Sequence, residues 1–168
     1  MITLNNFSLY EPEYKAFNAF YLQTADGLDW FYHRTRFQPD TLKICYDESG
    51  VIRMYSYQAD ILFPLGLSVT EVEPDKVPEG LNNHGDWLFL GGRIVPNRTA
   101  LAKAAENTRL RRIREASQLM VPLNTAMQLS DITEAETQRL KDLLAYVRKL
   151  EVLDVSASPD TPIPDLPQ

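Results

Sequence analysis

The side chains that could form a nucleophile and its base are few. The chain of 168 residues has one cysteine, Cys45, and two histidines, His33 and His84. A serine or cysteine nucleophile needs a base within reach, and that base is usually histidine. Cys45 lies in the middle of an alternating apolar segment, where a packing role is the commoner explanation. We therefore expect no catalytic residues and no enzymatic activity.

The residue types that hold metals or phosphates are equally sparse. A metal site needs three or four converging ligands. The acidic pairs Asp26/Asp29 and Asp47/Glu48 lie in segments typical of turns, where aspartate bonds to nearby backbone. The seven glycines form neither G-x-G-x-x-G nor G-x-x-x-x-G-K-[ST], the two common phosphate-binding patterns. We expect no bound metal and no cofactor.

The basic side chains are concentrated in one segment, at Arg109, Arg111, Arg112 and Arg114. Residues 98–114 hold six basic residues and one acidic residue, although the whole chain has a net charge of −6 and a pI near 4.9. Two interpretations stay open. In the first, a small regulatory protein binds nucleic acid through an Arg-rich helix over residues 109–114. The second is favoured, because apolar residues interleave with the arginines: a solvated helix face, or ion pairing with an acidic partner or the acidic N-terminal part.

The segment "DWFYHRTRF" combines aromatic residues with arginines. Alternation along a strand would place Trp30 and Tyr32 on one face and Phe31 and His33 on the other. Because both faces would then be aromatic, and because Trp, Tyr and Arg are enriched at protein interfaces, we expect a partner-binding surface here. Its expected members are Trp30, Tyr32, Arg34, Arg36 and Phe37. The alternative is that Trp30 belongs to the core.

The elements around these residues fall into two kinds. Before residue 97 the patterns predict β-strands at 42–46, 51–57, 67–73 and 87–95. The first two flank an Asp-Glu-Ser-Gly turn, and the last is divided by Gly91-Gly92, a pair that permits a tight hairpin. The opening segment, 7–32, is ambiguous between strand and short helix. We expect an antiparallel, β-rich N-terminal domain over residues 1–97.

After Pro96 the composition favours helix. Thr99 is the expected cap of a long helix that Pro122 should kink or break. Thr133 and Glu136 form the capping-box pattern of a second helix. The fold class is therefore α+β, with an antiparallel helical pair over residues 98–152 and a Pro-rich tail over residues 153–168 that is extended or disordered.

The long apolar stripe of the first helix needs more partner surface than one short helix offers, so we expect self-association. The expected residues are Ile113, Met120, Leu123, Leu140, Leu143, Leu144 and Val147.

We also expect the lone cysteine to indicate a reducing cytoplasm and the N-terminus to carry no signal peptide. The longest apolar run, 61–67, is too short to span a bilayer.

Several stretches together resemble the tail fibre assembly (Tfa) proteins of tailed bacteriophages, including the Mu and lambda examples. They are "GLDWFYHRTRFQPDTLKICYDESGVIRMYS", "PLGLSVTEVE", "GDWLFLGGRIV" and "LMVPLNTAMQLSDITEAETQRLKDLLAYVRKLEVLDV". Their order and spacing match over nearly the whole chain. One departure is Ala145–Arg148, where the family usually has a Trp-Lys-Lys-Tyr-like segment. Tyr146 is the residue expected to take over that packing role.

The resemblance implies a chaperone-like assembly factor. Its N-terminal part would bind the C-terminal region of the tail fibre, and its helices would promote correct folding and trimerisation of the fibre. The expected partners are then the fibre protein and further copies of this chain, with no nucleic acid and no membrane. The expected location is the host cytoplasm during assembly, and the fibre tip of the virion if the protein stays bound.

Overall fold

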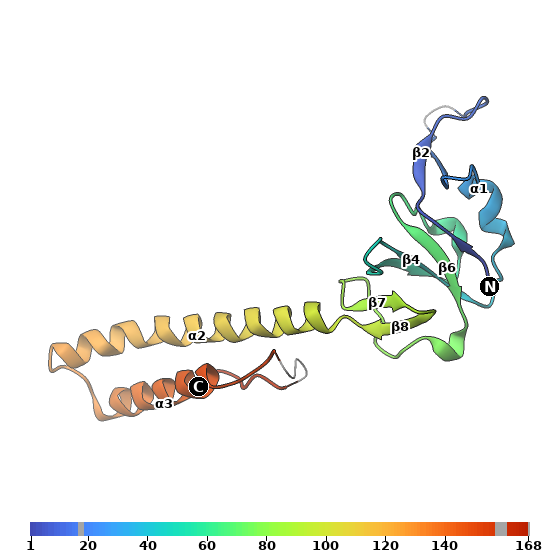
Figure 1. Cartoon of the computed structure of the whole chain (residues 1–168). Helices are drawn as coiled ribbons and strands as arrows, with labels where there is room; N and C mark the ends of the chain where they lie inside the picture. Colours follow the sequence, from blue (N-terminus) through green and yellow to red (C-terminus); the bar gives the residue numbers. More distant parts are fainter. Residues whose placement is uncertain (17–18, 157–160, 168) are drawn as a thin grey trace. The chain divides into compact units, whose positions relative to one another are not determined.

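The computed structural model describes residues 1–16, 19–156 and 161–167. The chain forms two compact units, which we call the sheet unit (Met1–Asn97) and the helical unit (Arg98–Gln168). Figure 1 shows the elements of each unit. The strands are β1 Thr3–Leu4, β2 Ser8–Tyr10, β3 Tyr21–Gln23, β4 Leu42–Tyr46, β5 Ile52–Ser56, β6 Ser68–Val72, β7 Trp87–Leu90 and β8 Arg93–Pro96. The helices are α1 Trp30–His33, α2 Arg98–Gln128 and α3 Glu134–Glu151, and short 3₁₀ turns are η1 Arg34–Arg36, η2 Ala59–Ile61 and η3 Pro74–Lys76.

The sheet unit is built on a four-stranded antiparallel sheet in the order β1-β6-β4-β5. The hairpin predicted from "PDTLKICYDESGVIRMYSY" is confirmed as β4–β5, and its turn is closed by Gly50 N–H donating to the Asp47 carbonyl at 2.8 Å. Gly50 has φ +81°, and a Cβ there would lie 2.9 Å from the carbonyl oxygen of Phe89. Glycine is therefore required both by the turn and by the close approach of β7.

Apolar clusters lie on both faces of the four-stranded sheet, because neighbouring strand residues point to opposite sides. Cys45 and Val69 belong to one cluster, which Trp30 and Phe7 complete. Ile44 belongs to the other, which the β7–β8 hairpin covers. The predicted turn at Gly91-Gly92 joins these two strands. The sheet is thus buried on both sides, and the predicted β-rich N-terminal part is confirmed.

Two charged side chains are buried within the sheet. Lys43 on β4 and Glu71 on β6 are cross-strand partners and are 1% and 2% exposed. The Lys43 ammonium donates to the carbonyls of Gln38, Thr41 and Tyr57, the last two at 2.9 Å. Burial lowers the pKa of Lys43, and Glu71 acts in the opposite direction. All three ammonium hydrogens thus have acceptors, which makes the buried charge tolerable.

The segment 30–36 is helical, so the strand alternation considered for its aromatic residues does not apply. Residues Trp30–His33 form a single helical turn, α1, which continues into η1. Asp29 caps it, because its Oδ1 accepts the Tyr32 N–H at 2.8 Å. An N-cap contact of this kind commits the backbone to a helical turn. The consequence is that Trp30 and Tyr32 do not share a face.

The helical unit contains the predicted pair, α2 and α3, which lie side by side (Figure 1). The expectation that Thr99 caps α2 was wrong, because the helix begins at Arg98 and Thr99 lies within its first turn. Of the two outcomes expected at Pro122, a kink or a break, the break does not occur, since the helix continues through this residue. Pro122 and Gln118 are exposed, so the carbonyl that a proline leaves unpaired one turn earlier can bond to water. The capping box is confirmed: Thr133 Oγ1 accepts from Glu136 N–H at 3.2 Å, and Thr133 N–H donates to Glu136 at 2.8 Å.

Residues 161–167 of the C-terminal tail form no helix or strand, and they pack against the helices. Ile163 and Leu166 contact the apolar cluster between α2 and α3. Tyr146 Oη donates to the Pro164 carbonyl at 2.9 Å, and Arg112 pairs with Asp165 at 2.9 Å. These contacts hold residues 161–167 against the helices, where the sequence analysis expected an extended or disordered tail. Within the described ranges no helix is long and apolar enough to cross a membrane.

Candidate partner-binding surface

Two of the predicted partner-binding residues belong to the core. Trp30 is 1% exposed and Phe37 is 7% exposed. The Trp30 ring contacts the rings of Phe7 and Phe37, with centroids 5.3 Å and 5.9 Å apart. Its indole Nε1–H donates to the Leu62 carbonyl at 3.0 Å. Neither residue can present its side chain to a partner, which corrects that part of the prediction.

The other three predicted residues lie at the surface beside α1. Tyr32 is 78% exposed, Arg36 is exposed, and Arg34 is half-buried. The Arg34 guanidinium lies 4.6 Å from the centroid of the Phe31 ring, in a cation–π contact. It also donates to the Asp60 carbonyl of η2 at 3.4 Å. These contacts link α1 and η1 to η2.

Sequence reasoning missed the apolar side chains of the segment that follows β5. Ile61 is 69% exposed and Phe63 is 40% exposed, next to the Leu62 carbonyl that accepts from Trp30. Together with Phe31, Tyr32, Arg34 and Arg36, these two residues form what we call the α1–η2 surface. The sequence does contain an indication of this surface: residues 61–65, "ILFPL", are apolar, but Pro64 makes a central strand there unfavourable. Only the fold shows that this run lies beside α1.

A second group of aromatic residues lies on the β2–β3 hairpin. The Tyr21 ring contacts both Tyr10 and Phe31, with centroid distances of 6.2 Å and 5.7 Å. Tyr10 Oη donates to Asp29 Oδ2 at 2.8 Å, which raises the pKa of Tyr10 to about 12. Asp29 therefore holds the hairpin and the start of α1 together. An open hollow of about 690 Å³ lies at the hairpin end and is lined by Leu9, Tyr10, Glu11, Pro12, Lys15, Ala16, Ala19, Phe20 and Tyr21.

The structure places Cys45 in the core of the sheet unit and His33 in a local hydrogen bond. Cys45 is fully buried, and burial raises the pKa of its thiol to about 12, so the thiolate that would attack a substrate is not formed near neutral pH. His33 Nδ1 lies 2.9 Å from the Asp29 carbonyl. Among the described residues no three His, Cys, Asp or Glu side chains converge as a metal site.

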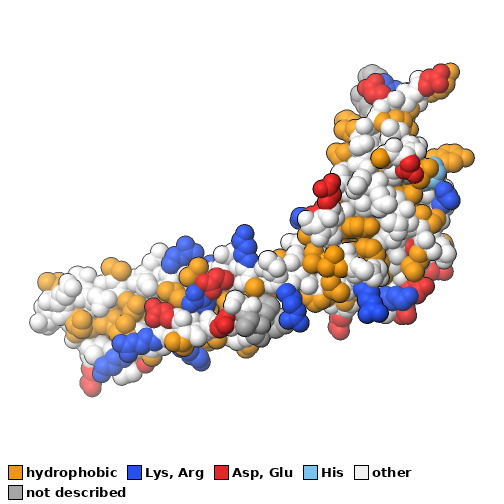
Figure 2. Space-filling model, viewed as in Figure 1, with side chains coloured by type: hydrophobic (Ala, Val, Ile, Leu, Met, Phe, Trp, Pro, Cys, Tyr) orange, Lys and Arg blue, Asp and Glu red, His pale blue; other side chains and the backbone are white. Residues whose placement is uncertain are grey.

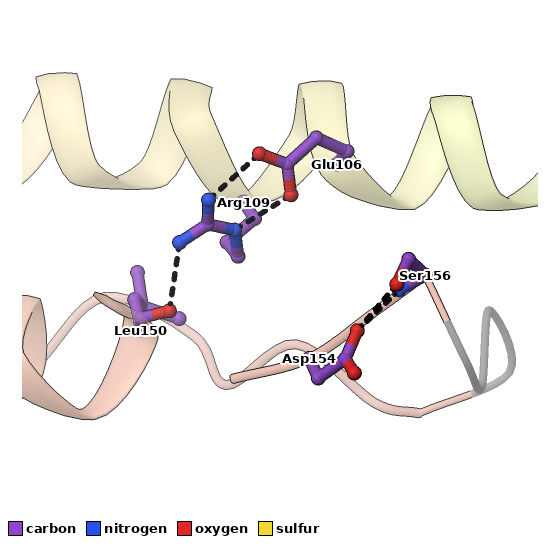
Figure 3. Close-up of polar contacts among 5 residues, drawn as sticks. All are labelled: Glu106, Arg109, Leu150, Asp154 and Ser156. Carbon is purple, nitrogen blue, oxygen red and sulfur yellow. Dashed lines mark hydrogen bonds and ion pairs between the residues drawn. The ribbon is translucent and has the colours of Figure 1, made fainter. Parts of the chain in front are cut away.

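Three of the four clustered arginines have carboxylate partners inside the helical unit. Arg109 forms two bonds of 2.7 Å to Glu106 and a third of 3.0 Å to the Leu150 carbonyl, so it joins α2 to the end of α3 (Figure 3). The bonds from Arg109 lower the pKa of Glu106. Arg111 and Arg112 both pair with Glu115 at 3.6 Å. The arginines thus serve local ion pairing, which favours the second interpretation of this segment.

The residues expected to drive self-association mostly pack inside one chain. Leu140 and Leu143 are buried, while Ile113, Met120, Leu123 and Val147 are half-buried in the apolar cluster of the helix pair. Leu144 is 40% exposed. Other apolar side chains remain at the surface of α2: Leu110, Leu119, Val121 and Met127. Figure 2 shows apolar side chains at the surface of both units, with charges of both signs along the helical unit.

Comparison with known proteins identifies the family. The sequence profile described as "Caudovirales tail fibre assembly protein, lambda gpK" matches residues 33–168. Tail fiber assembly protein U' of Escherichia phage Mu is 32% identical over 161 residues, which cover 92% of this chain and 88% of the relative. The probable tail fiber assembly protein of Escherichia phage P2 is 31% identical over 157 residues, with the same coverage of both chains. Tail fiber assembly protein U' of Escherichia phage P1 is 31% identical over 161 residues, again covering 92% and 88%. As the quoted stretches predicted, this chain belongs to the tail fibre assembly protein family of the Caudovirales.

Proposed function

We propose that the protein is a chaperone that binds the C-terminal region of a tail fibre and promotes its folding and trimerisation. Membership of the family supports a role in tail fibre assembly, and the relatives carry that role in their names. An intertwined β-rich trimer forms slowly, because its contacts are non-local and its strand edges are exposed until assembly is complete. A partner that covers those edges and holds the chain ends together reduces the search for the correct register.

The α1–η2 surface is the observation that carries the binding site. The sheet unit has closed its core on both faces of the sheet, and yet it leaves Phe31, Tyr32 and Ile61 at 42%, 78% and 69% exposure. Exposed aromatic and aliphatic side chains next to a guanidinium are the composition of a protein-binding site. Of the residues that the sequence predicts, Tyr32, Arg34 and Arg36 stay in the proposed site, and Ile61 and Phe63 replace the buried Trp30 and Phe37.

The remaining parts of the proposal follow from the same assignment. The protein acts by binding and not by catalysis, it works in the host cytoplasm during assembly, and it stays on the fibre tip if it is not released. Copies of the chain associate through the helical unit. The nucleic-acid alternative is not favoured, because Arg109, Arg111 and Arg112 are already engaged by carboxylates of the same helix.

The test is capture of the C-terminal fragment of the fibre encoded in the same phage, after co-expression with this chain. Tyr32→Ala should weaken capture by about 30- to 700-fold, the loss typical of a buried interface aromatic at roughly 1.4 kcal/mol per tenfold change. Tyr14→Ala is the matched control, since Tyr14 is 86% exposed but lies on the β2–β3 connection. Circular dichroism establishes that both variants are folded. Unchanged capture by folded Tyr32→Ala and Ile61→Ala would place the binding site elsewhere.

A further inference from the structure

The C-terminal tail packs over the apolar cluster between α2 and α3, and we call the surface that it covers the groove. Beneath it, Ala116, Leu143, Tyr146 and Leu150 are at most 7% exposed and form the apolar cluster between α2 and α3. Ile163 and Leu166 pack against this cluster from outside. The two helices supply the floor of the groove, and residues 161–167 supply its cover.

Residues 161–167 make a hydrogen bond and an ion pair with the helices, and both are modest in strength. Tyr146 Oη donates to a backbone carbonyl, that of Pro164, at 2.9 Å. Arg112 pairs with Asp165, whose side chain is 92% exposed, so this ion pair contributes little. Every residue of 161–167 is half-buried or exposed, in contrast to Val155, which is 2% exposed. The segment is therefore held by a small number of partly exposed contacts, although it helps to cover the cluster beneath it.

These contacts define what the groove recognises. Two aliphatic side chains flank a Pro-Asp pair, in the sequence Ile163-Pro164-Asp165-Leu166. The Tyr146 hydroxyl donates to a backbone carbonyl of the peptide, and Arg112 pairs with its acidic side chain. Prolines restrict the unbound segment to extended conformations, so ordering it costs less entropy than ordering an ordinary chain. The ligand class is an extended, Pro-rich peptide with aliphatic residues on both sides of an acidic one.

We propose that this groove is an exchangeable peptide-binding site, and that the tail of a second copy of the chain replaces the chain's own tail in it. The same contacts form whether the segment comes from the same chain or another, which is the condition for segment exchange between copies. This deepens the self-association proposed above. Copies gathered on one fibre end would meet at effective concentrations near the millimolar range, where a weak contact is occupied.

The first experiment tests the groove with a labelled peptide of residues 161–167, followed by fluorescence anisotropy. The receptor is the full chain carrying Ile163→Asp and Leu166→Asp, which should free its own groove. We expect saturable binding to this variant and at least tenfold weaker binding to the intact chain, because the intact chain's tail competes. In the variant background, Tyr146→Phe should weaken binding several-fold, whereas Arg114→Ala, at an exposed position of α2, should leave it unchanged.

The two experiments test two claims separately: that the groove binds a peptide, and that the peptide comes from a second copy. Equal binding to both chains, no binding, or binding of a control peptide with Asp at the two aliphatic positions would overturn the site. Loss of the helical circular dichroism signal in the receptor would do the same, since the tail would then be an integral part of the fold. The second experiment immobilises the receptor and offers intact chain, which should be retained and then released by free peptide. If the peptide binds but the intact chain is not retained, the tail in the groove does not come from a second copy. That result would not bear on capture of the fibre by the sheet unit.

Discussion

The two units of this chain bury apolar side chains in different ways. In the sheet unit, clusters on both faces of one sheet enclose every residue of β6, and even Lys43 and Glu71 are buried with their polar groups bonded. In the helical unit, α2 contributes one buried residue, Ala116, and α3 contributes four. The tail is needed to cover part of the seam. The sheet unit thus has a closed core, whereas the helical unit has a single apolar interface between two helices, which the tail covers in part.

This difference indicates how each unit meets a partner. A closed core leaves specific side chains outside, as at Tyr32 and Ile61, and these can be changed without loss of the fold. In the helical unit, residues outside the two helices help to cover the apolar cluster, as Ile163 and Leu166 do. In the sheet unit we therefore expect each substitution to change either stability or partner binding. In the helical unit we expect one substitution to change both stability and self-association.

The largest expected effect is that of Trp30→Ala, which should lower the free energy of unfolding of the sheet unit by about 3–5 kcal/mol, because a large side chain is removed from a packed cluster. Urea denaturation followed by circular dichroism measures the loss. The paired Tyr32→Ala substitution should change stability by less than about 0.5 kcal/mol. Similar losses for the two variants would show that the core and the surface are not separated at α1.

Glu71→Ala should have the next largest effect. The carboxylate accepts the backbone N–H of Ile2 at 2.8 Å and of Gln38 at 2.5 Å, and it is buried opposite Lys43. Removing it leaves these two backbone donors without their acceptor, at a cost of about 1–3 kcal/mol for a buried donor. The control is Glu48→Ala in the exposed β4–β5 turn, which should leave the urea midpoint unchanged. A small loss for Glu71→Ala would mean that water reaches this part of the sheet.

Removal of the helical unit should lower the association state. A chain ending at Asn97 should remain folded and sediment with less self-association than the intact chain, because its core is complete within residues 1–97. Analytical ultracentrifugation at several concentrations measures the change. If the shortened and intact chains show the same number of copies per particle, self-association belongs to the sheet unit.

The smallest effect concerns the start of α3. Thr133→Ala removes the side-chain cap and should lower the stability of the helical unit by about 1 kcal/mol. Thr125→Ala is the matched control, because Thr125 bonds back to the Val121 carbonyl inside α2 and is exposed. That substitution should be neutral or slightly stabilising. Thermal unfolding of both variants, monitored by circular dichroism, gives the comparison.

Local patterns alone determined most of the elements of this protein. The β4–β5 hairpin, the Gly91-Gly92 turn and the Thr133 capping box each depend on residues close together in the sequence, and all three follow from the residue pattern. The stretches that resemble the family are continuous in the sequence, so they were sufficient to predict membership of it. The expectation that the chain lacks a nucleophile with its base also rests on residue types alone.

Only the tertiary structure decided which aromatic residues face outward and where the tail lies. A strand and a helical turn place Trp30 and Tyr32 differently, and the choice depended on the Asp29 cap together with the burial of Trp30 against Phe7. The exposure of Ile61 depends on η2 lying beside α1, where the bond from Trp30 to Leu62 joins positions 32 residues apart. The docking of Ile163 and Leu166 depends on a groove that exists only after α2 and α3 have paired. Contacts between residues distant in sequence leave no periodic pattern in either segment, and for that reason the binding surface and the covered groove are visible only in the folded chain.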